Sequence, residues 1–340
     1  VTEDRSPSPR NIAADPKSSL AKNTIKTKPW VNPNSNCDTI MNIFSRANTL
    51  AKIRDFFAKR NVIEVETPLL SHSTNPAPHL NSFSCDNLYL QTSPEFAMKR
   101  LLAAGSGDIY QICKAFRKEE AGRLHNPEFT ILEWYRIGFD HHDLMDEMNE
   151  FLKEVINTPD AERFTYSEIF AKILGISPHE SSLDQLKTVA QNNNSFVTDL
   201  PDEFDTWLQL LFSNLIEPKL GLERPVFIYD FPESQAMLAK VRDEQPKIAS
   251  RFEVYFKGVE LANGFHELSD AREQRKRFMQ DLAKRRELNL PPIPLDENFL
   301  VALPNLPDCA GVALGIDRLL LLAADANSLN EILCYPFAVS

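Results

Sequence analysis

The 340-residue sequence has few cysteines and no CxxC pair. The five are Cys37, Cys85, Cys113, Cys309 and Cys334. An odd number without metal-binding spacing disfavours a disulfide framework or a zinc site, and favours reduced thiols in a cytoplasm. The seven histidines also show no spacing typical of metal ligands.

Long apolar runs and positive charge are scarce as well. The longest apolar run, Leu319 to Ala324, is far too short to span a bilayer, and no secretory signal opens the chain. The net charge of −11 disfavours a broad, nonspecific grip on a phosphate backbone, although it is compatible with a local basic pocket. We therefore expect a cytoplasmic protein that has no membrane partner.

Composition divides the chain into a tail and one large domain. Residues 1–36 are rich in Ser, Pro, Asn and Lys and nearly free of aromatic residues, which predicts a flexible tail. With 43% hydrophobic and 25% charged residues, the sequence is otherwise typical of a soluble globular protein with a sizeable core. No internal repeat is visible, so we expect a single domain over residues 37–340.

Apolar periodicity and turn residues predict the order of helices and strands. Helices are expected from Asp38 through Phe57, from Ser93-Pro94-Glu95, through most of 142–220, and over 268–290. Strands are expected at 62–68, 88–91, within 108–136, at 226–230 and at 252–262, and a strand followed by a helix at 311–324. Strands joined by hairpins, with helices grouped elsewhere, predict an α+β fold with a mainly antiparallel sheet flanked by helices.

The segment Phe116 to Arg136, FRKEEAGRLHNPEFTILEWYR, is the most informative of the chain. Alternation places Phe129, Ile131, Glu133 and Tyr135 on one side of a strand. A carboxylate among large apolar side chains is costly unless it meets a cation or a hydrogen-bond donor, so the segment predicts the floor of a charged-ligand site. Taken alone, an arginine and a glutamate so spaced are more often a structural ion pair on a hairpin, and His125-Asn126-Pro127-Glu128 is typical of a polar turn.

Two further segments carry candidate residues. In GVELANGFHEL, Glu260 lies in an apolar strand, and a bulge at Gly264 would turn Glu267 toward the same site. There the two carboxylates would hold Mg²⁺, or one of them would bind a substrate ammonium. The alternative is an edge strand with solvated acids. The segment GVALGIDRLLLL places Arg318 where a strand becomes a helix, and it matches neither the P-loop nor the GxGxxG pattern. Its alternative is a buried helix with a local Asp317–Arg318 pair.

A helix and strand ending at Pro68, the FRKEE…HNPEFTILEWYR hairpin and GVALGIDR resemble, in this order, motifs 1, 2 and 3 of the class II aminoacyl-tRNA synthetases. HNPEFT and ELANGFHEL resemble the lysyl-tRNA synthetase branch. Only some 37 polar residues precede motif 1, where a full enzyme has an anticodon-binding domain, and Ala313 replaces a usual glycine. In both respects the chain is similar to the shortened paralogues that modify elongation factor P.

The resemblance, which covers roughly residues 38–337, implies a two-step ligase without an anticodon-binding domain. ATP and (R)-β-lysine, or less well α-lysine, form an adenylate. The acyl group then passes to the ε-amino group of a specific lysine on elongation factor P. Motif 1 in this family forms a dimer interface, so a homodimer through residues 38–60 and the strand near Pro68 is expected.

The resemblance also implies roles for individual residues. Those expected to bind ATP are Arg117, Lys118, Glu119, Asn126, Phe129, Glu260, Leu261, Gly315 and Arg318. Among them, Arg117, Glu260 and Arg318 are the expected catalytic residues. Those expected to bind the amino acid are Ser93, Pro94, Glu95, Tyr135, Glu267 and Ala313. Those expected to bind Mg²⁺ are Glu260 and Glu267.

Ala313 leads to a separate hypothesis about the substrate. Its methyl group would crowd the position of an α-amine, whereas a β-amino acid carries the amine one carbon further along. We therefore expect Ala313 to contribute to a preference for β-lysine over α-lysine.

Three other functions remain open at this point. One is a lysyl-adenylating enzyme that charges tRNA, although the net charge and the short N-terminal segment lead us to expect no tRNA partner. A second is a different ligase on the same fold, such as one that makes asparagine from ammonia. The third is a catalytically inactive, synthetase-like regulator.

Overall fold

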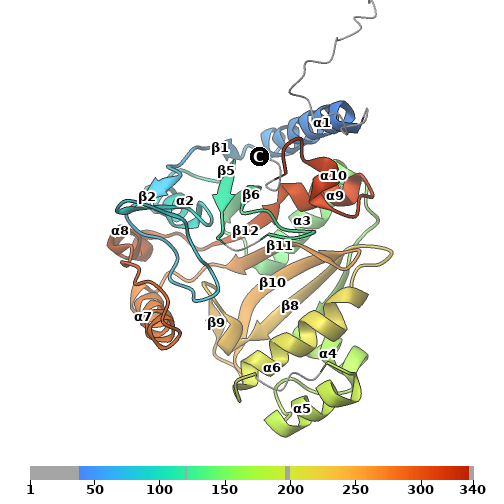
Figure 1. The fold of residues 1–340 in the computed structure, drawn as a ribbon. Coiled ribbons are helices and arrows are strands. Elements are labelled where there is room, and N and C mark those ends of the chain that lie inside the picture. The colour runs from blue at the N-terminus through green and yellow to red at the C-terminus, as the bar shows by residue number, and fades with distance from the viewer. Residues whose placement is uncertain (1–37, 119–120, 196–199, 337–340) are drawn as a thin grey trace, which may run out of the picture. The chain divides into compact units, whose positions relative to one another are not determined.

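The computed structural model describes residues 38–118, 121–195 and 200–336. The predicted tail at 1–36 and Glu119 lie outside these residues. Within the described chain, the main sheet has nine strands in the order β1-β5-β6-β12-β11-β10-β8-β7, with β9 beside β10, and β2, β4 and β3 form a smaller sheet. Among the described strands, only β1–β5 and β7–β8 pair in parallel. The predicted α+β fold with a mainly antiparallel sheet is confirmed (Figure 1).

The bounds of the strands are β1 Ile63–Glu64, β2 Leu70–Ser71, β3 Ser84–Cys85, β4 Leu88–Leu90, β5 Ile109–Phe116, β6 Glu128–Ile137, β7 Glu162–Thr165, β8 Val226–Pro232, β9 Val241–Arg242, β10 Ile248–Phe256, β11 Val259–His266 and β12 Cys309–Gly315. Those of the helices are α1 Asp38–Ala58, α2 Glu95–Ala103, α3 His141–Ile156, α4 Tyr166–Leu174, α5 Leu183–Asn192, α6 Phe204–Leu211, α7 Ala271–Glu287, α8 Glu297–Ala302, α9 Ile316–Ala323 and α10 Leu329–Ile332. None of the described helices is both long and apolar enough to cross a membrane.

The two faces of β6 have different partners. Leu132 and Trp134 belong to the largest core cluster, together with Phe57 of α1 and Phe151 of α3. The Trp134 ring lies 5.4 Å from that of Phe57 and 5.5 Å from that of Phe151, between centroids. Because side chains alternate along a strand, this packing leaves the odd-numbered residues of β6 to face the opposite side of the sheet.

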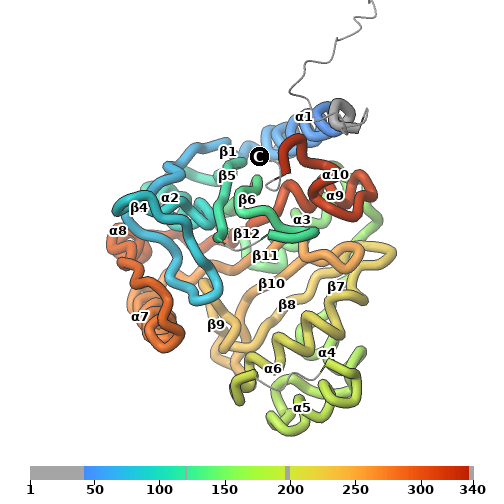
Figure 2. Tube along the Cα trace, in the orientation of Figure 1, coloured from blue at the N-terminus to red at the C-terminus, as the bar shows by residue number. Residues whose placement is uncertain are grey.

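A second core covers the other end of the sheet. Helices α4, α5 and α6 gather beside β7 and β8 (Figure 2), and Tyr166 stacks on Phe212 with ring centroids 5.5 Å apart. Residues 142–220 are mostly helical, as predicted, but the sequence interpretation missed β7. This strand has only four residues, all partly exposed, so it lacks a long apolar pattern.

The single strand predicted at 252–262 is wrong. Two strands, β10 and β11, meet there at Lys257-Gly258, and both turn residues have positive φ, 50° and 69°. Such two-residue turns match the twist of a hairpin. The predicted bulge at Gly264 is also wrong, because the register shifts between Val254 and Tyr255 instead. A Cβ on Gly264 would lie 2.4 Å from the Phe252 ring, so close packing requires this glycine.

The side chain of Asp317 in α9 forms hydrogen bonds with both α1 and β6. Its Oδ1 accepts a hydrogen bond of 2.6 Å from Arg46 Nη1 of α1, and its Oδ2 accepts one of 2.8 Å from the Thr130 backbone N–H of β6. Arg46 Nη2 also donates to Thr130 Oγ1 at 2.6 Å. The Asp317 side chain is 3% exposed, so its charge depends on these donors. The alternative of a local Asp317–Arg318 pair is therefore wrong.

Candidate active site

One row of side chains crosses the open face of the main sheet. The register places Glu253, Asn263, Ala313, Glu133 and Gln111 next to one another on β10, β11, β12, β6 and β5. Glu253, Asn263 and Ala313 line a pocket with a volume of about 320 Å³. We call it the nucleotide pocket below, after the ligand that the sequence predicts for it. These three residues form its floor, and the row continues beyond the pocket through the buried Glu133 and Gln111.

The nucleotide pocket brings together most of the residues predicted to bind ATP. Its lining includes Arg117, Asn126, Phe129, Glu260, Leu261, Ala313, Gly315 and Arg318. The Arg117 guanidinium lies 5.1 Å from the centre of the Phe129 ring, a cation–π distance. Lys118 is exposed and is not among the lining residues, and its backbone N–H donates to Asn81. Glu119 lies outside the described residues.

Arg318 is held in the nucleotide pocket by contacts on two sides. Its Nη1 donates to the backbone oxygen of Glu260 at 2.7 Å and lies 3.5 Å from the Glu260 carboxylate. Its Nη2 lies 2.5 Å from His125 Nε2, and its Nε donates to the Leu124 oxygen at 3.4 Å. The guanidinium thereby connects β11 with the turn between β5 and β6. It is a fixed positive charge at the pocket wall.

Glu260 and Glu267 belong to different polar groups. Glu260 lies in the nucleotide pocket beside Arg318, and its side chain is 36% exposed. The Glu267 side chain is 1% exposed and pairs with Lys99 at 2.6 Å. The expected bulge at Gly264 does not exist, so nothing turns Glu267 toward Glu260. This geometry contradicts the expectation that both carboxylates share one Mg²⁺ ion.

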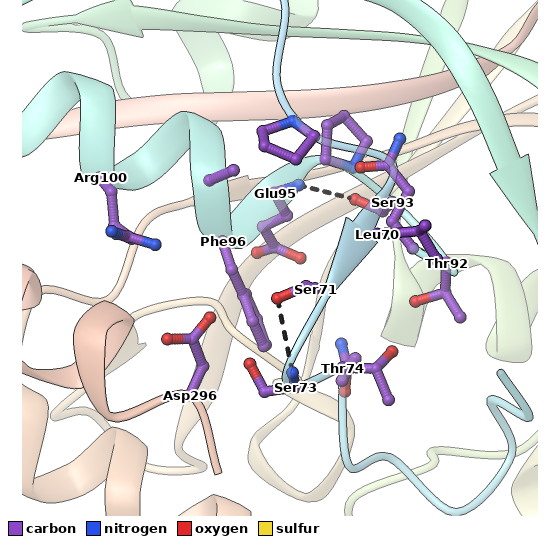
Figure 3. Close-up of a pocket in the computed structure, with 15 residues that line it drawn as sticks. Leu70, Ser71, Ser73, Thr74, Thr92, Ser93, Glu95, Phe96, Arg100 and Asp296 are labelled. Atoms are coloured by element: carbon purple, nitrogen blue, oxygen red, sulfur yellow. Dashed lines mark hydrogen bonds between the residues drawn. The ribbon is translucent and has the colours of Figure 1, made fainter. Parts of the chain in front are cut away.

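A second pocket opens at the start of α2. Ser93, Pro94 and Glu95 line it together with Phe96, Arg100 and residues of the small sheet (Figure 3). Ser93 Oγ accepts a hydrogen bond of 3.0 Å from the Glu95 backbone N–H. The same hydroxyl donates to Glu133 Oε2 at 2.8 Å. Glu133 therefore connects this pocket with the floor of the nucleotide pocket, where Ala313 is its neighbour in register.

Between the two pockets lies a buried group of three carboxylates, one ammonium and one phenol. We call it the acidic cluster, and its members are Glu95, Lys99, Glu133, Tyr135 and Glu267. Lys99 Nζ lies 2.6 Å from both Glu95 Oε1 and Glu267 Oε2. The Tyr135 hydroxyl donates to Glu133 Oε1 at 2.5 Å. The predicted amino-acid ligands Ser93, Glu95, Tyr135 and Glu267 are thus part of one connected network.

Gly311 makes room for two members of this cluster. A Cβ built on Gly311 would lie 2.3 Å from the Tyr135 ring and 2.6 Å from Glu267 Oε1. Contacts this short do not occur between nonbonded atoms, so any other residue would displace both side chains. The glycine of β12 therefore sets the space in which the phenol and the carboxylate meet.

Burial and mutual repulsion shift the pKa values of the cluster. Burial, and then the charge of Glu95, raise the pKa of Glu133 to about 7. Burial also raises the pKa of Glu267, while the Lys99 ammonium acts against this rise. Although burial lowers the pKa of Lys99, its two carboxylate partners raise it above the usual value. We assign the proton taken up near neutral pH to Glu133, because its partners are neutral hydroxyls and Glu267 contacts a cation.

Several residues of the site are missing from the sequence predictions. Lys99 was missed, although its spacing of four residues from Glu95 on a helix indicates a pair. Arg251, Glu253 and Asn263 were missed because β10 and β11 were interpreted as one strand. Arg251 donates to Glu253 and to Asn263 Oδ1, so these three form one buried network at the pocket floor.

One group outside the pockets brings two neighbouring histidines and an aspartate together in space. The ligand atoms of His141, His142 and Asp230 lie within 4.8 Å of one another. Both oxygens of Asp230 already have partners, however: His141 Nε2 at 3.2 Å and Arg242 Nη2 at 2.8 Å. We interpret the group as an ion-pair network that anchors the start of α3.

Comparisons with known proteins agree with this geometry. Residues 25–339 match the family model described as tRNA synthetases class II (D, K and N). This chain belongs to the class II tRNA synthetase family. The family predicted from the three motifs is thus confirmed, and the nucleotide pocket lies where motifs 2 and 3 meet.

Relatives within this family share about half of the residues. The chain is 53% identical over 311 residues to the elongation factor P–(R)-β-lysine ligase of Vibrio atlanticus, covering 88% of this chain and 96% of the relative. A protein of the same name in Vibrio cholerae is also 53% identical over 311 residues, which cover 88% of this chain and 96% of that protein. One in Photobacterium profundum is 49% identical over 326 residues, which cover 92% of this chain and the whole relative.

The assignment of the proton predicts a stability effect of Glu133→Gln. The folded state raises the pKa of Glu133 from 4.5 to about 7, so the folded protein loses stability as the pH rises through this window. Glutamine keeps the shape and stays neutral. We expect Glu133→Gln to raise the melting temperature above neutral pH by about 2–5 °C, measured by scanning calorimetry across the window.

The matched control is Glu128→Gln, because Glu128 lies on the same strand and its side chain is 53% exposed. This variant should melt like the parent protein at every pH. If Glu133→Gln instead kept the full pH dependence of the parent, the proton would belong to Glu267.

Proposed function

We propose that this chain is an ATP-dependent ligase that activates (R)-β-lysine as its adenylate and transfers it to the ε-amino group of a lysine on elongation factor P. α-Lysine is the poorer substrate in this proposal. The observation that carries it is that two kinds of site adjoin: a pocket lined by three arginines, Arg117, Arg251 and Arg318, and the acidic cluster. The names of the relatives support the same reaction.

The charges of the two sites match the reactants of the first step. A substrate carboxylate oxygen attacks the α-phosphorus of ATP, an acyl–phosphate bond forms, and pyrophosphate leaves. Arg117 holds the carboxylate and the α-phosphate as negative charge builds between them. Arg318 neutralises the outer phosphates, and Phe129 and Asn126 contact the adenine. The two ammonium groups of the amino acid lie against the acidic cluster.

The second step needs a nucleophile from the partner protein. The neutral ε-amine of a lysine on elongation factor P attacks the acyl carbon, an amide bond forms, and AMP leaves with the electrons of the broken acyl–phosphate bond. The attacking nitrogen loses one proton to the solvent as the amide forms. Arg117 remains in place to hold the departing phosphate.

Glu260 fits a Mg²⁺ ion bound together with ATP. Its carboxylate is partly exposed in the nucleotide pocket, and oxygen ligands of this kind suit Mg²⁺. Glu267 does not fit, because it is buried against Lys99. When bound, the ion would screen the charge of the leaving pyrophosphate.

A cytoplasmic location and a homodimer are also part of the proposal. Cys85, Cys113, Cys309 and Cys334 are free thiols, as expected in a reducing compartment. Helix α1 exposes two large apolar side chains, Ile43 at 50% and Phe44 at 61%, and Ile63 of β1 is 55% exposed. Apolar groups of this size are typical of a surface that another chain covers.

The proposed activity predicts the outcome of an ATP–pyrophosphate exchange assay with (R)-β-lysine, α-lysine and aspartate. We expect exchange with (R)-β-lysine, weaker exchange with α-lysine and none with aspartate, because the acidic cluster repels a second carboxylate. Transfer is then measured with elongation factor P and with tRNA as acceptors. Transfer to tRNA alone would refute the proposed acceptor, and a lack of exchange with all three would indicate the inactive regulator.

The position of Ala313 predicts a change of substrate preference. Ala313 lies on the pocket floor between Glu133 and Asn263 in register. In this proposal its methyl group reduces the space for an α-amine. We expect Ala313→Gly to reduce the ratio of the adenylation rate with (R)-β-lysine to that with α-lysine by about tenfold. This is about the discrimination that one methyl group gives in a binding pocket. The KM for ATP is measured as well, because Ala313 also lines the nucleotide pocket, and the ratio is compared at saturating ATP. An unaltered ratio would exclude this role of Ala313.

The dimer proposal predicts that a charge on α1 separates the protomers. We expect the parent protein to have twice the chain mass of 38.7 kDa in size-exclusion chromatography with light scattering. Phe44→Glu should shift it toward the single-chain mass, because a buried charge at an apolar contact is unfavourable. Val301→Glu is the matched control, since Val301 is 74% exposed on α8. A parent protein that elutes as a single chain would contradict the proposal.

A further inference from the structure

An ammonium group of the protein itself occupies the centre of the acidic cluster. Lys99 lies on the second turn of α2, and its side chain is only 1% exposed. Its Nζ contacts the carboxylates of Glu95 and Glu267, each at 2.6 Å. These are two of the groups that the proposed function assigns to the ammonium groups of the substrate.

With all three carboxylates ionised, the cluster lacks two positive charges, and in the empty site the proton bound by Glu133 near neutral pH lowers this deficit. Glu95, Glu133 and Glu267 carry three negative charges when ionised, and Lys99 carries one positive charge. The Tyr135 phenol is neutral, because burial raises its pKa well above the usual value. A ligand with two ammonium groups would restore neutrality, whereas a ligand with one would leave a buried charge uncompensated.

We propose that Lys99 is a positioning residue that acts as a built-in counter-ion. It holds Glu95 and Glu267 in place and sets the charge of the cluster so that the site selects a diammonium substrate. This inference rests on the proposed function, because it takes the acidic cluster as the amino-acid site.

The packing of α2 supports a fixed position for Lys99. The neighbouring core residues Met98 and Leu102 of the same helix are fully buried. Glu95, one turn earlier, is fixed at its backbone N–H by Ser93, which also donates to Glu133. Lys99 therefore connects the start of α2 with the end of β11. Its ammonium has no exposed surface through which water could replace the two carboxylates.

Other titratable groups near the cluster do not change this charge count. Cys113 of β5 lies near Glu133, and Cys309 of β12 lies near Glu267 and Lys99. Burial raises the pKa of each thiol to about 12, so both stay neutral at physiological pH. The protons that substrate binding releases must therefore come from the carboxyl groups. This makes the number of released protons a direct measure of the charge that Lys99 supplies.

The experiment compares the parent protein with Lys99→Met and Lys99→Arg. Binding of (R)-β-lysine is measured near neutral pH by isothermal titration calorimetry in two buffers that differ in ionisation enthalpy, which gives the number of protons released. Binding of ATP is measured separately as a control for the fold. Melting temperatures are recorded for all three proteins.

We expect Lys99→Met to release about one proton more than the parent, because a carboxyl group without its cation binds a proton in the empty site. Its affinity for (R)-β-lysine should fall by about tenfold or more. The additional proton must leave before the ligand binds, and each unit by which the pKa of that carboxyl group exceeds the pH lowers the affinity about tenfold. Lys99→Arg keeps the charge and should release the same number of protons as the parent. Binding of ATP should stay unchanged in both variants.

A Lys99→Met variant that binds (R)-β-lysine with the affinity and proton release of the parent would overturn the inference. So would a variant with weaker binding and an unchanged proton count, which is the result of a purely structural role. If the parent binds ATP but neither (R)-β-lysine nor α-lysine, the proposed function fails instead. The two failures are thus distinguishable.

A second variant applies if Lys99→Met does not fold. The double substitution Glu95→Gln/Lys99→Met removes one negative and one positive charge together, so it restores the charge of the parent cluster. Recovery of a folded protein with the proton release of the parent would support the inference. A double variant that stays unfolded, or that folds and releases the additional proton, would overturn it.

Discussion

The carboxylate of Asp317 is the interaction on which the geometry of the site depends. It accepts hydrogen bonds from Arg46 of α1 and from the backbone of Thr130 in β6, while its own backbone begins α9. A buried charge of this kind tolerates only small displacements before it loses its donors. The positions of α1, β6 and α9 are therefore coupled. Arg318, the next residue along the chain, is thereby directed toward the nucleotide pocket.

The register of the sheet determines the spacing of the side chains in the site. Each strand contributes one side chain to the row at the pocket floor, so spacing across the row is the spacing between strands, about 4.8 Å. Small residues on β12, Gly311 and Ala313, separate the acidic side chains of β6 from the neighbouring β11. A site that binds a flexible diammonium substrate beside a triphosphate benefits from such preorganisation. Its own side chains are already ordered, so little of their conformational entropy is lost on binding.

The sequence alone predicts the parts of the site that local patterns encode. The hairpin from Phe116 to Arg136 was predicted because its alternation is long, and the same side chains line the site floor. The pairing of Lys99 with Glu267 was missed because it joins residues far apart in sequence through a helix docked at a strand end. The hairpin turn at Lys257-Gly258 was missed because it lacks the usual Asn-Gly signal. The N-terminal tail and Glu119 stay predictions.

The buried charges of the acidic cluster also bear on the lifetime of the protein. A group of buried carboxylates that Lys99 neutralises only in part lowers the stability of the empty fold, and a ligand that binds there raises the stability in proportion to the logarithm of its concentration. Proteases and chaperones act on the unfolded fraction. If these carboxylates bind the amino acid as proposed, the stability of the folded enzyme would rise with the concentration of its substrate.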